Sequence, residues 1–365
     1  MTISRHDRLA TALADRGADA YVAVKRPNQL YLLAEHHDDP SSVISRANCG
    51  AVLFHGDDVV VFPGIWISNA CRDLLDNCEV VVNDPGDPPP HQQLATRLSA
   101  MGLKKVLFDT LSADMIGAIT SKAAATECVE NDFVTSQLRR TKDEHDIAGM
   151  REAARVADLG MQTAFGCIRP GVTCAEAIAE GTAAMLRAGA ESVAMAPASG
   201  VGTYYLDSGE DPRRTIEAGD MVFIDMGIWV HGYLGDMTRA AIVGEGSKEQ
   251  HSLLTTVQQA YKLASSAMVP GARAGEIYQS VVDHYAATDM DRYFVHHLSH
   301  GLGLGGDLPR VARGGEDVLQ VGDALSCEPG CYVPGIGGAR VENMILVTAD
   351  GPEELTRTPI DPELG

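Results

Sequence analysis

The sequence predicts two domains, an α/β domain at the N-terminus and an α+β domain after it. The length of 365 residues corresponds to about two domains at roughly 150 residues each. Up to about residue 135, short apolar runs alternate with helical patterns, which is typical of an α/β arrangement. Beyond that point, two pairs of helical patterns are each followed by strand-like segments. We place the domains at 1–138 and 139–365.

The N-terminal domain is expected to alternate helices and strands. The predicted elements are a short amphipathic helix over 8–18, strands over 20–24 and 28–33, a helix over 92–101 and a strand over 105–108. Residues 50–54 and 58–62 predict a hairpin, because His55-Gly56-Asp57 between them has turn chemistry. A Pro-rich loop covers 85–90. No catalytic constellation is recognisable in this domain.

The second domain should open with a helix that runs to about Phe165. Thr141 can cap it, with Glu144 at the third helical position as the partner in a capping box. A second helix is expected over 173–188. The same arrangement returns as helices over 250–269 and 274–287, separated by Pro270-Gly271. This repetition suggests an internal duplication.

The charge balance excludes several classes of function. The formal net charge is −21, and −16 of it falls in residues 141–365. Such a chain lacks the basic footprint that nucleic acids or anionic membranes require. No run of about 18 apolar residues predicts a membrane span, and no apolar segment of a secretory signal follows the first residues. The eight cysteines form no C-x-x-C pair, so reduced thiols in a cytoplasmic protein are expected.

Two hairpins are each expected to bring a pair of carboxylates together. In the first, residues 220–239, Asp225 and Asp236 should face each other across a turn near His231-Gly232. In the second, Glu328 and Glu342 each lie seven residues from Gly335, the centre of a Gly-rich turn, so they should also face each other. Opposed like charges in apolar strands are destabilising, and a bound cation removes that penalty.

Three histidines lie between the hairpins, at positions 296, 297 and 300, in a glycine-dense segment. A lone histidine there would more often be a packed core residue. Four carboxylates and one imidazole form a plausible dinuclear site for Mn²⁺, Co²⁺, Fe²⁺ or Zn²⁺, with Mn²⁺ favoured. The alternative is that both hairpins are ordinary strand pairs with polar ends and that the acid surplus is a solvated surface.

The ordered motifs D-x-G, D-x-T-R, H-G-x-G, E-P-G and R-x-E resemble those of the pita-bread metallopeptidase family. That family includes aminopeptidase P, prolidase, methionine aminopeptidase and creatinase. The resemblance covers nearly the whole chain and implies a creatinase/prolidase-like N-terminal domain before a pita-bread catalytic domain. It also implies a homodimer. By this resemblance two divalent ions are held by five residues: Asp225, Asp236, His300, Glu328 and Glu342.

The resemblance also implies roles around the metal ions. Glu328 would exchange a proton with the metal-bridging water as general base and then acid. His296 would donate a hydrogen bond to the substrate carbonyl or the developing oxyanion. Arg340 would be a substrate-binding residue that orients a carboxylate.

Two substrate-side histidines of the family are missing from this chain. The segment 198–207 has none, and Asp307 occupies the place of the second. Tyr204, Tyr205, Asp207 and Asp307 are therefore candidate pocket residues, with simple loop roles as the alternative for the first three. The metal-binding residues look intact while the substrate pocket looks altered.

Three functions remain open from the sequence. The first is an Xaa-Pro peptidase that cleaves a small peptide or amide bond with a metal-bridging hydroxide. The second is an enzyme acting on a non-peptide small molecule, either a creatinase-like C–N hydrolase or a metal-dependent lyase. The third is a non-catalytic binding protein, against which the complete ligand set argues.

Overall fold

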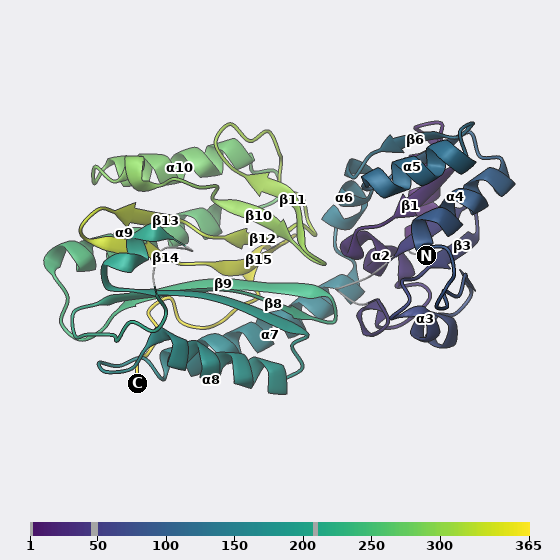
Figure 1. The fold of residues 1–365 in the computed structure, drawn as a ribbon. Helices are drawn as coiled ribbons and strands as arrows, with labels where there is room; N and C mark the ends of the chain where they lie inside the picture. The colour runs from purple at the N-terminus through teal and green to yellow at the C-terminus, as the bar shows by residue number, and fades with distance from the viewer. Residues whose placement is uncertain (1–2, 45–49, 207–210) are drawn as a thin grey trace. The chain divides into compact units, whose positions relative to one another are not determined.

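The computed structural model describes residues 3–44, 50–206 and 211–365. The chain forms two compact units, Met1–Arg139 and Arg140–Gly365 (Figure 1). None of the helices in the described ranges is long and apolar enough to cross a membrane.

The first unit is built around one mixed sheet of six strands in the order β4-β3-β2-β1-β5-β6. The strands are β1 (Ala20–Ala23), β2 (Ala51–His55), β3 (Asp58–Phe62), β4 (Glu79–Val80), β5 (Lys105–Phe108) and β6 (Glu127–Glu130). The helices are α1 (Arg5–Ala14), α2 (Arg26–Leu33), α3 (Ser68–Leu74), α4 (Pro90–Met101), α5 (Ala113–Lys122) and α6 (Phe133–Arg140), with a 3₁₀ turn η1 (Pro40–Ser42). Apolar residues of β1, β2, β3 and β5 pack with those of α4 and α5 to form its core.

The prediction of a strand over 28–33 is wrong, because these residues form helix α2. All six residues are buried, so the segment shows neither the period of a half-buried helix nor that of a strand. The predicted hairpin of β2 and β3 is confirmed, with Ala51 opposite Phe62 and His55 opposite Asp58.

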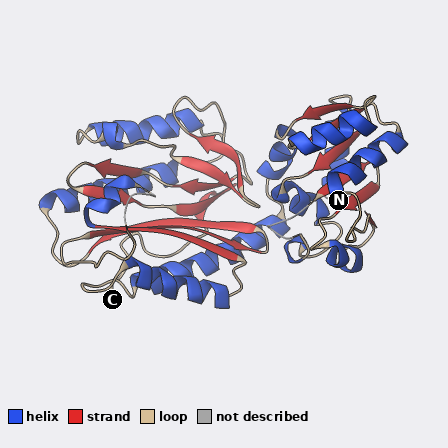
Figure 2. Cartoon of the chain, viewed as in Figure 1, coloured by secondary structure: helices blue, strands red, loops and turns tan. Residues whose placement is uncertain are grey.

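The described residues of the second unit form two helix pairs and three sheets. The helices are α7 (Glu144–Phe165), α8 (Cys174–Arg187), α9 (Lys248–Ala267) and α10 (Ala274–Ala286), with 3₁₀ turns η2 (Gly200–Tyr205) and η3 (Asp291–Tyr293). The strands are β7 (Ser192–Ser199), β8 (Met221–Val230), β9 (Tyr233–Ile242), β10 (Ser299–Leu302), β11 (Gly306–Val311), β12 (Ala324–Cys327), β13 (Gly330–Val333), β14 (Gly337–Arg340), β15 (Asn343–Thr348) and β16 (Gly351–Glu354). The sheets have the orders β7-β8-β9, β11-β10-β12-β15-β16 and β13-β14. In Figure 2 the strands of this unit have α7 and α8 below them and α10 above them.

The cap of α7 differs from the prediction. Asp143, not Thr141, is the N-cap, and its capping-box partner is Asp146. Thr141 lies two residues too early, and an aspartate serves as well as a threonine at this position. The other predicted helix of this pair is confirmed, since α8 begins after its N-cap Thr173 and ends before Ala188.

The two helix pairs of the second unit are connected in the same way. Each passes through a glycine of positive φ, Gly171 at 90° and Gly271 at 86°. The N–H of Gly171 donates to the carbonyl of Ile216, and the N–H of Gly271 donates to that of Leu319. Because both connections return to a distant chain segment through an equivalent backbone hydrogen bond, the structure supports the suggested internal duplication.

Candidate metal centre

The first carboxylate pair lies on the antiparallel strands β8 and β9. Asp225 is opposite Thr238, and Asp236 is opposite Gly227. The predicted direct opposition of the two aspartates is therefore wrong by two residues, because the turn consists of His231 and Gly232, both with positive φ. A slip of two residues keeps side chains on the same face, so both carboxylates still point to one side.

The second pair follows the predicted register. Cys327 is opposite Asn343, and Gly330 is opposite Arg340. The pair β12 and β15 and the pair β13 and β14 therefore follow the same register. Glu328 and Glu342 lie between these two strand pairs, at positions that this register places opposite each other. Glu342 bridges to Thr238 of β9, which brings this hairpin against the first one.

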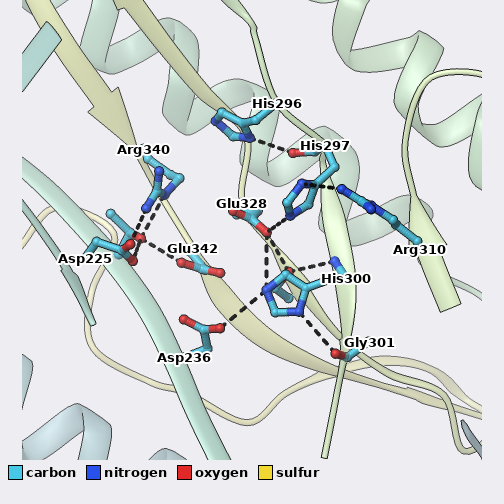
Figure 3. A network of polar contacts seen from close by, with 12 residues as sticks. Asp225, Asp236, His296, His297, His300, Gly301, Arg310, Glu328, Arg340 and Glu342 are labelled. Atoms are coloured by element: carbon cyan, nitrogen blue, oxygen red, sulfur yellow. Dashed lines mark hydrogen bonds and ion pairs between the residues drawn. The ribbon is translucent and has the colours of Figure 1, made fainter. Parts of the chain in front are cut away.

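Figure 3 shows how these residues converge around His300 of β10. Nε2 of His300 lies 3.4 Å from Oδ2 of Asp236 and 3.6 Å from Oε1 of Glu328. Potential ligand atoms of Asp236, His300 and Glu342 all lie within 4.8 Å of one another. The structure thus brings four of the five predicted ligands, Asp236, His300, Glu328 and Glu342, directly together.

The hydrogen bond at the far side of His300 suits metal binding. Nδ1 lies 3.1 Å from the carbonyl oxygen of Gly301, which can only accept, so Nδ1 carries a proton. In the neutral ring, Nε2 then has a lone pair aimed at the carboxylates. Burial alone would lower the pKa of His300, but Asp236 and Glu328 raise it to about 9. Without a cation the ring is therefore protonated near neutral pH.

The carboxylates also show the strain of an uncompensated cluster. Burial and the neighbouring acids Asp236, Glu328 and Asp225 raise the pKa of Glu342 well above its usual range. Burial likewise raises the pKa of Asp236. Glu328 differs, because His297, Arg340 and His300 outweigh its burial and lower its pKa to about 2.

Thr238 links Asp225 to this cluster. Its Oγ1 lies 2.7 Å from Oδ1 of Asp225 and 2.7 Å from Oε2 of Glu342. One hydroxyl proton cannot serve two ionised carboxylates at once. Both contacts are satisfied when Glu342 is protonated and donates to Thr238, which agrees with the raised pKa of Glu342.

Arg340 holds Asp225 from the other side. Its Nη2 lies 2.6 Å from Oδ2 of Asp225, Nε donates to Thr238, and Nη1 donates to the hydroxyl of Tyr332. Arg340 is buried, with 5% of its surface exposed. Arg340 thus orients the protein carboxylate of Asp225, and all three of its guanidinium nitrogens contact protein groups.

His296 is oriented differently from the prediction. Nδ1 lies 2.6 Å from the carbonyl oxygen of His297, so it donates there. Burial and the charge of Arg340 lower the pKa of His296, which favours the neutral ring. Nε2 then accepts from the Tyr332 hydroxyl at 3.1 Å. This arrangement does not support the predicted donation from His296 to a substrate oxygen.

The remaining predicted pocket residues lie in different settings. Tyr204 and Tyr205 are in η2, which packs on β14, and 53% of Tyr205 is exposed. Asp207 lies outside the described residues. The Asp307 side chain is buried in an ion pair, with Oδ2 3.3 Å from Nζ of Lys142 and 1% of the side chain exposed. Direct contact of Asp307 with a substrate therefore has no support from this geometry.

His297 is a site residue that the sequence motifs did not predict. Its Nε2 lies 3.1 Å from Oε1 of Glu328. Its position beside His296 and three residues before His300 was visible, but the sequence held no sign of which histidine faces the carboxylates.

The donor set fits divalent cations. Two carboxylates with raised pKa values, a third that is ionised and Nε2 of an imidazole converge on one region. A cation would remove the repulsion that now favours protonation. Oxygen donors with one imidazole suit Mn²⁺, Fe²⁺, Co²⁺ or Zn²⁺.

Comparison with known proteins agrees with this geometry. The family model of metallopeptidase family M24 matches residues 148–349. The Xaa-Pro dipeptidase of Pyrococcus furiosus is 33% identical over 254 residues, which cover 68% of this chain and 72% of that protein. A putative dipeptidase of Bacillus subtilis, YkvY, is 26% identical over 98% of this chain and 99% of its own length.

Solved structures share the two-domain fold. The Xaa-Pro dipeptidase from Bacillus anthracis superposes with a TM-score of 0.86 at 27% identity, covering 99% of this chain and 98% of that one. The predicted pita-bread fold with its additional N-terminal domain is thereby confirmed. Since the family model spans more than half of the chain and includes both carboxylate hairpins, the chain belongs to metallopeptidase family M24.

Proposed function

We propose that this chain is a dinuclear-metal hydrolase of the Xaa-Pro dipeptidase type. The observation that carries the proposal is the convergence of Asp236, Glu328 and Glu342 on Nε2 of His300. Relatives that are named Xaa-Pro dipeptidases support the substrate class, a short peptide with proline after the scissile bond.

Five residues would hold the two ions: Asp225, Asp236, His300, Glu328 and Glu342. The ions would supply a water of lowered pKa and a Lewis acid for the scissile carbonyl. Mn²⁺ is the proposed metal, with Co²⁺, Fe²⁺ and Zn²⁺ as alternatives, because the donors are mostly carboxylate oxygens.

Glu328 is the proposed proton carrier. It is ionised throughout the neutral range, since its pKa is lowered to about 2. Oε1 accepts a hydrogen bond from Ser326 at 3.0 Å, which limits rotation of the carboxylate. A fixed, ionised carboxylate can accept a proton from the attacking water and return it to the leaving amine.

Arg340 is proposed to act through Asp225 and not on the substrate directly. It donates to Thr238 and pairs with Asp225, so it holds one ligand in place and adds a positive charge beside the cluster. Tyr204, Tyr205 and Asp207 remain proposed pocket residues, and Asp307 could contribute only through the backbone of β11 that it anchors to Lys142.

A second candidate is an enzyme for a non-peptide amide or related small molecule. The observation that favours it is the place of Asp307, which is tied to Lys142 where a substrate-side histidine was expected. The pocket that receives the substrate would then differ from that of the dipeptidases, while the metal chemistry would be the same.

The remaining proposals concern the setting of the enzyme. We propose a homodimer, on the basis of the family resemblance. We propose a cytoplasmic location, because the cysteine spacing favours reduced thiols. A small peptide or small molecule is the proposed partner, and nucleic acid and membrane are not expected at a net charge of −21.

The test loads the protein with Mn²⁺ or Co²⁺, counts bound ions and assays Ala-Pro and Gly-Pro against Ala-Ala. Release of proline with two ions per chain is expected. Two ions without proline release would exclude the dipeptidase and favour the second candidate. Fewer than one ion per chain would exclude both.

Variants at the centre separate binding from folding. D225A and E328A should lose at least about 100-fold in kcat, since each removes a proposed ligand, while their circular dichroism stays unchanged. The control is E353Q on β16, where Glu353 is half-buried in a pair with Arg151 and is not among the proposed ligands, so this variant should keep full activity. Retained turnover in both centre variants would refute the assignment.

A further inference from the structure

His297 is a second imidazole at the edge of the metal centre. Its Nε2 lies 3.1 Å from Oε1 of Glu328, and ligand atoms of His297, His300 and Glu328 lie within 4.8 Å of one another. It could therefore be a sixth metal ligand, or it could donate a hydrogen bond to Glu328. The position of its ring proton decides between the two roles.

Arg310 determines where that proton lies. Its Nη2 is 3.1 Å from Nδ1 of His297 (Figure 3). A guanidinium can only donate hydrogen bonds, so Nδ1 must accept and cannot carry a proton. In the neutral ring the proton is then on Nε2, the nitrogen that faces Glu328.

His300 shows the opposite arrangement three residues later. Its Nδ1 faces the carbonyl oxygen of Gly301, an acceptor, so the lone pair of the neutral ring is on Nε2. His300 on β10 lies opposite Arg310 on β11, so the residue that orients His297 is the strand neighbour of His300. The same ring type is thus prepared as a ligand at His300 and as a donor at His297.

Metal ligation by His297 would reverse this arrangement. The lone pair would have to move to Nε2, and the proton to Nδ1, where it would face the guanidinium of Arg310 at 3.1 Å. Two donors in contact are unfavourable. Nε2 of His297 is also buried and has no other hydrogen-bond partner among the described residues. Oε1 of Glu328, 3.1 Å away, is the acceptor within its reach, although the two groups are not fully aligned.

We propose that Arg310 and His297 form a positioning pair that directs an N–H at Oε1 of Glu328. Ser326 donates to the same oxygen at 3.0 Å, so both donors hold one oxygen of the carboxylate. Oε2 carries neither contact and is left for the ion and for proton transfer. This inference rests on the proposed role of Glu328, but its central statement, the position of the ring proton, does not depend on activity.

The test starts with the ring proton itself. A long-range ¹H–¹⁵N correlation spectrum of ¹⁵N-histidine-labelled, Zn²⁺-loaded protein identifies which nitrogen of each histidine carries hydrogen, and H297Q assigns the signal of His297. We expect Nε2–H at His297, and a larger share of Nδ1–H in R310M. A proton on Nδ1 in the unmodified protein would overturn the proposal, whether or not any peptide is cleaved.

Metal binding supplies the second readout. H297L should still bind two ions, but with roughly tenfold lower affinity, as is common when a group supporting a ligand is removed. H297Q should stay within about threefold, because its amide can accept from Arg310 and donate to Glu328 in the same way. R310M should resemble H297L or lie between the two.

Three results would contradict the positioning role. If H297L and H297Q both bind one ion fewer, or both change the visible absorption of the Co²⁺-loaded protein, His297 is a ligand. If H297L matches the unmodified protein in affinity and in kcat, the contact has no role. If H297Q fails as fully as H297L, the side-chain donor is not what matters. Should no Xaa-Pro peptide be cleaved, the proton position and the affinities still test the pair.

Discussion

Replacing Arg239 by methionine should destabilise the second unit strongly, although Arg239 is neither a proposed metal ligand nor a proposed substrate-binding residue. This residue ends the D-x-T-R motif, has no exposed surface and uses all five of its N–H groups. The acceptors are the carbonyl oxygens of Thr238, Glu342, Thr358 and Pro359 and Oδ1 of Asn343. Arg239 therefore joins the C-terminal segment to the backbone of a proposed metal ligand.

The magnitude follows from the count of donors. A typical intramolecular hydrogen bond contributes about 1 kcal/mol net, so losing five should cost about 5 kcal/mol. Lysine has three donors, so R239K should lose at least two bonds and about 2 kcal/mol. Burial lowers the pKa of Arg239 to about 10, and all five of its hydrogen-bond acceptors are neutral oxygens, so the hydrogen bonds set the magnitude.

Differential scanning calorimetry of the metal-free protein measures the effect. For a unit of this size 1 kcal/mol corresponds to about 2–4 °C, so R239M should lower Tm by roughly 10–20 °C and R239K by roughly 4–8 °C. The control is R213M, because the Arg213 side chain is 81% exposed and its pairing with Asp211 should contribute under about 1 kcal/mol. A shift in R239M no larger than that in R213M would refute the reasoning.

Two further predictions concern the metal centre and a buried ion pair. Mn²⁺ binding at pH 8 should release about one proton from His300, whose pKa is about 9, and further protons from Glu342, whose pKa is raised by burial and the neighbouring acids. The apparent affinity should therefore rise with pH, and calorimetry in buffers of different ionisation enthalpy measures the release. D307N should lower the free energy of unfolding by about 3 kcal/mol, because it leaves the buried Lys142 without its carboxylate. The control E152Q removes the exposed pair with Arg155 and should lower it by under about 1 kcal/mol. Denaturant titrations measure both values, and equal losses would contradict the argument.

Local signals explain which parts of the fold could be predicted. Helix α8 is bounded by Thr173 and Ala188 because its capping box and apolar spacing are local features. Helix α2 lacked such features, since it is buried on all sides and its burial comes from the rest of its unit. The register of β8 and β9 depended on a turn of two positive-φ residues, His231 and Gly232, and the two-residue error left the face of Asp225 correct.

The ligand set could be predicted further than the hydrogen bonds around it. Paired acids in two hairpins indicated a cation site, because repulsion and desolvation make such pairs rare without one. Thr238 was in the motif, but its contacts with both Asp225 and Glu342 arise only when the two hairpins meet. Asp307 was expected at the substrate because of its place in the motif, whereas Lys142, 165 positions away, takes its carboxylate.

The histidines show why residue type alone does not determine a role at this centre. His296, His297 and His300 lie within five positions, yet their Nδ1 atoms meet a carbonyl, a guanidinium and a carbonyl in turn. Each neighbour fixes one ring nitrogen and so decides what the other can do. The Tyr332 hydroxyl donates to Nε2 of His296, and carboxylates surround Nε2 of His300. His297 is the ring that presents an N–H to Glu328. If R310M leaves the ring proton of His297 in place, the neighbour does not set the tautomer, and the division of roles among the three rings must have another cause.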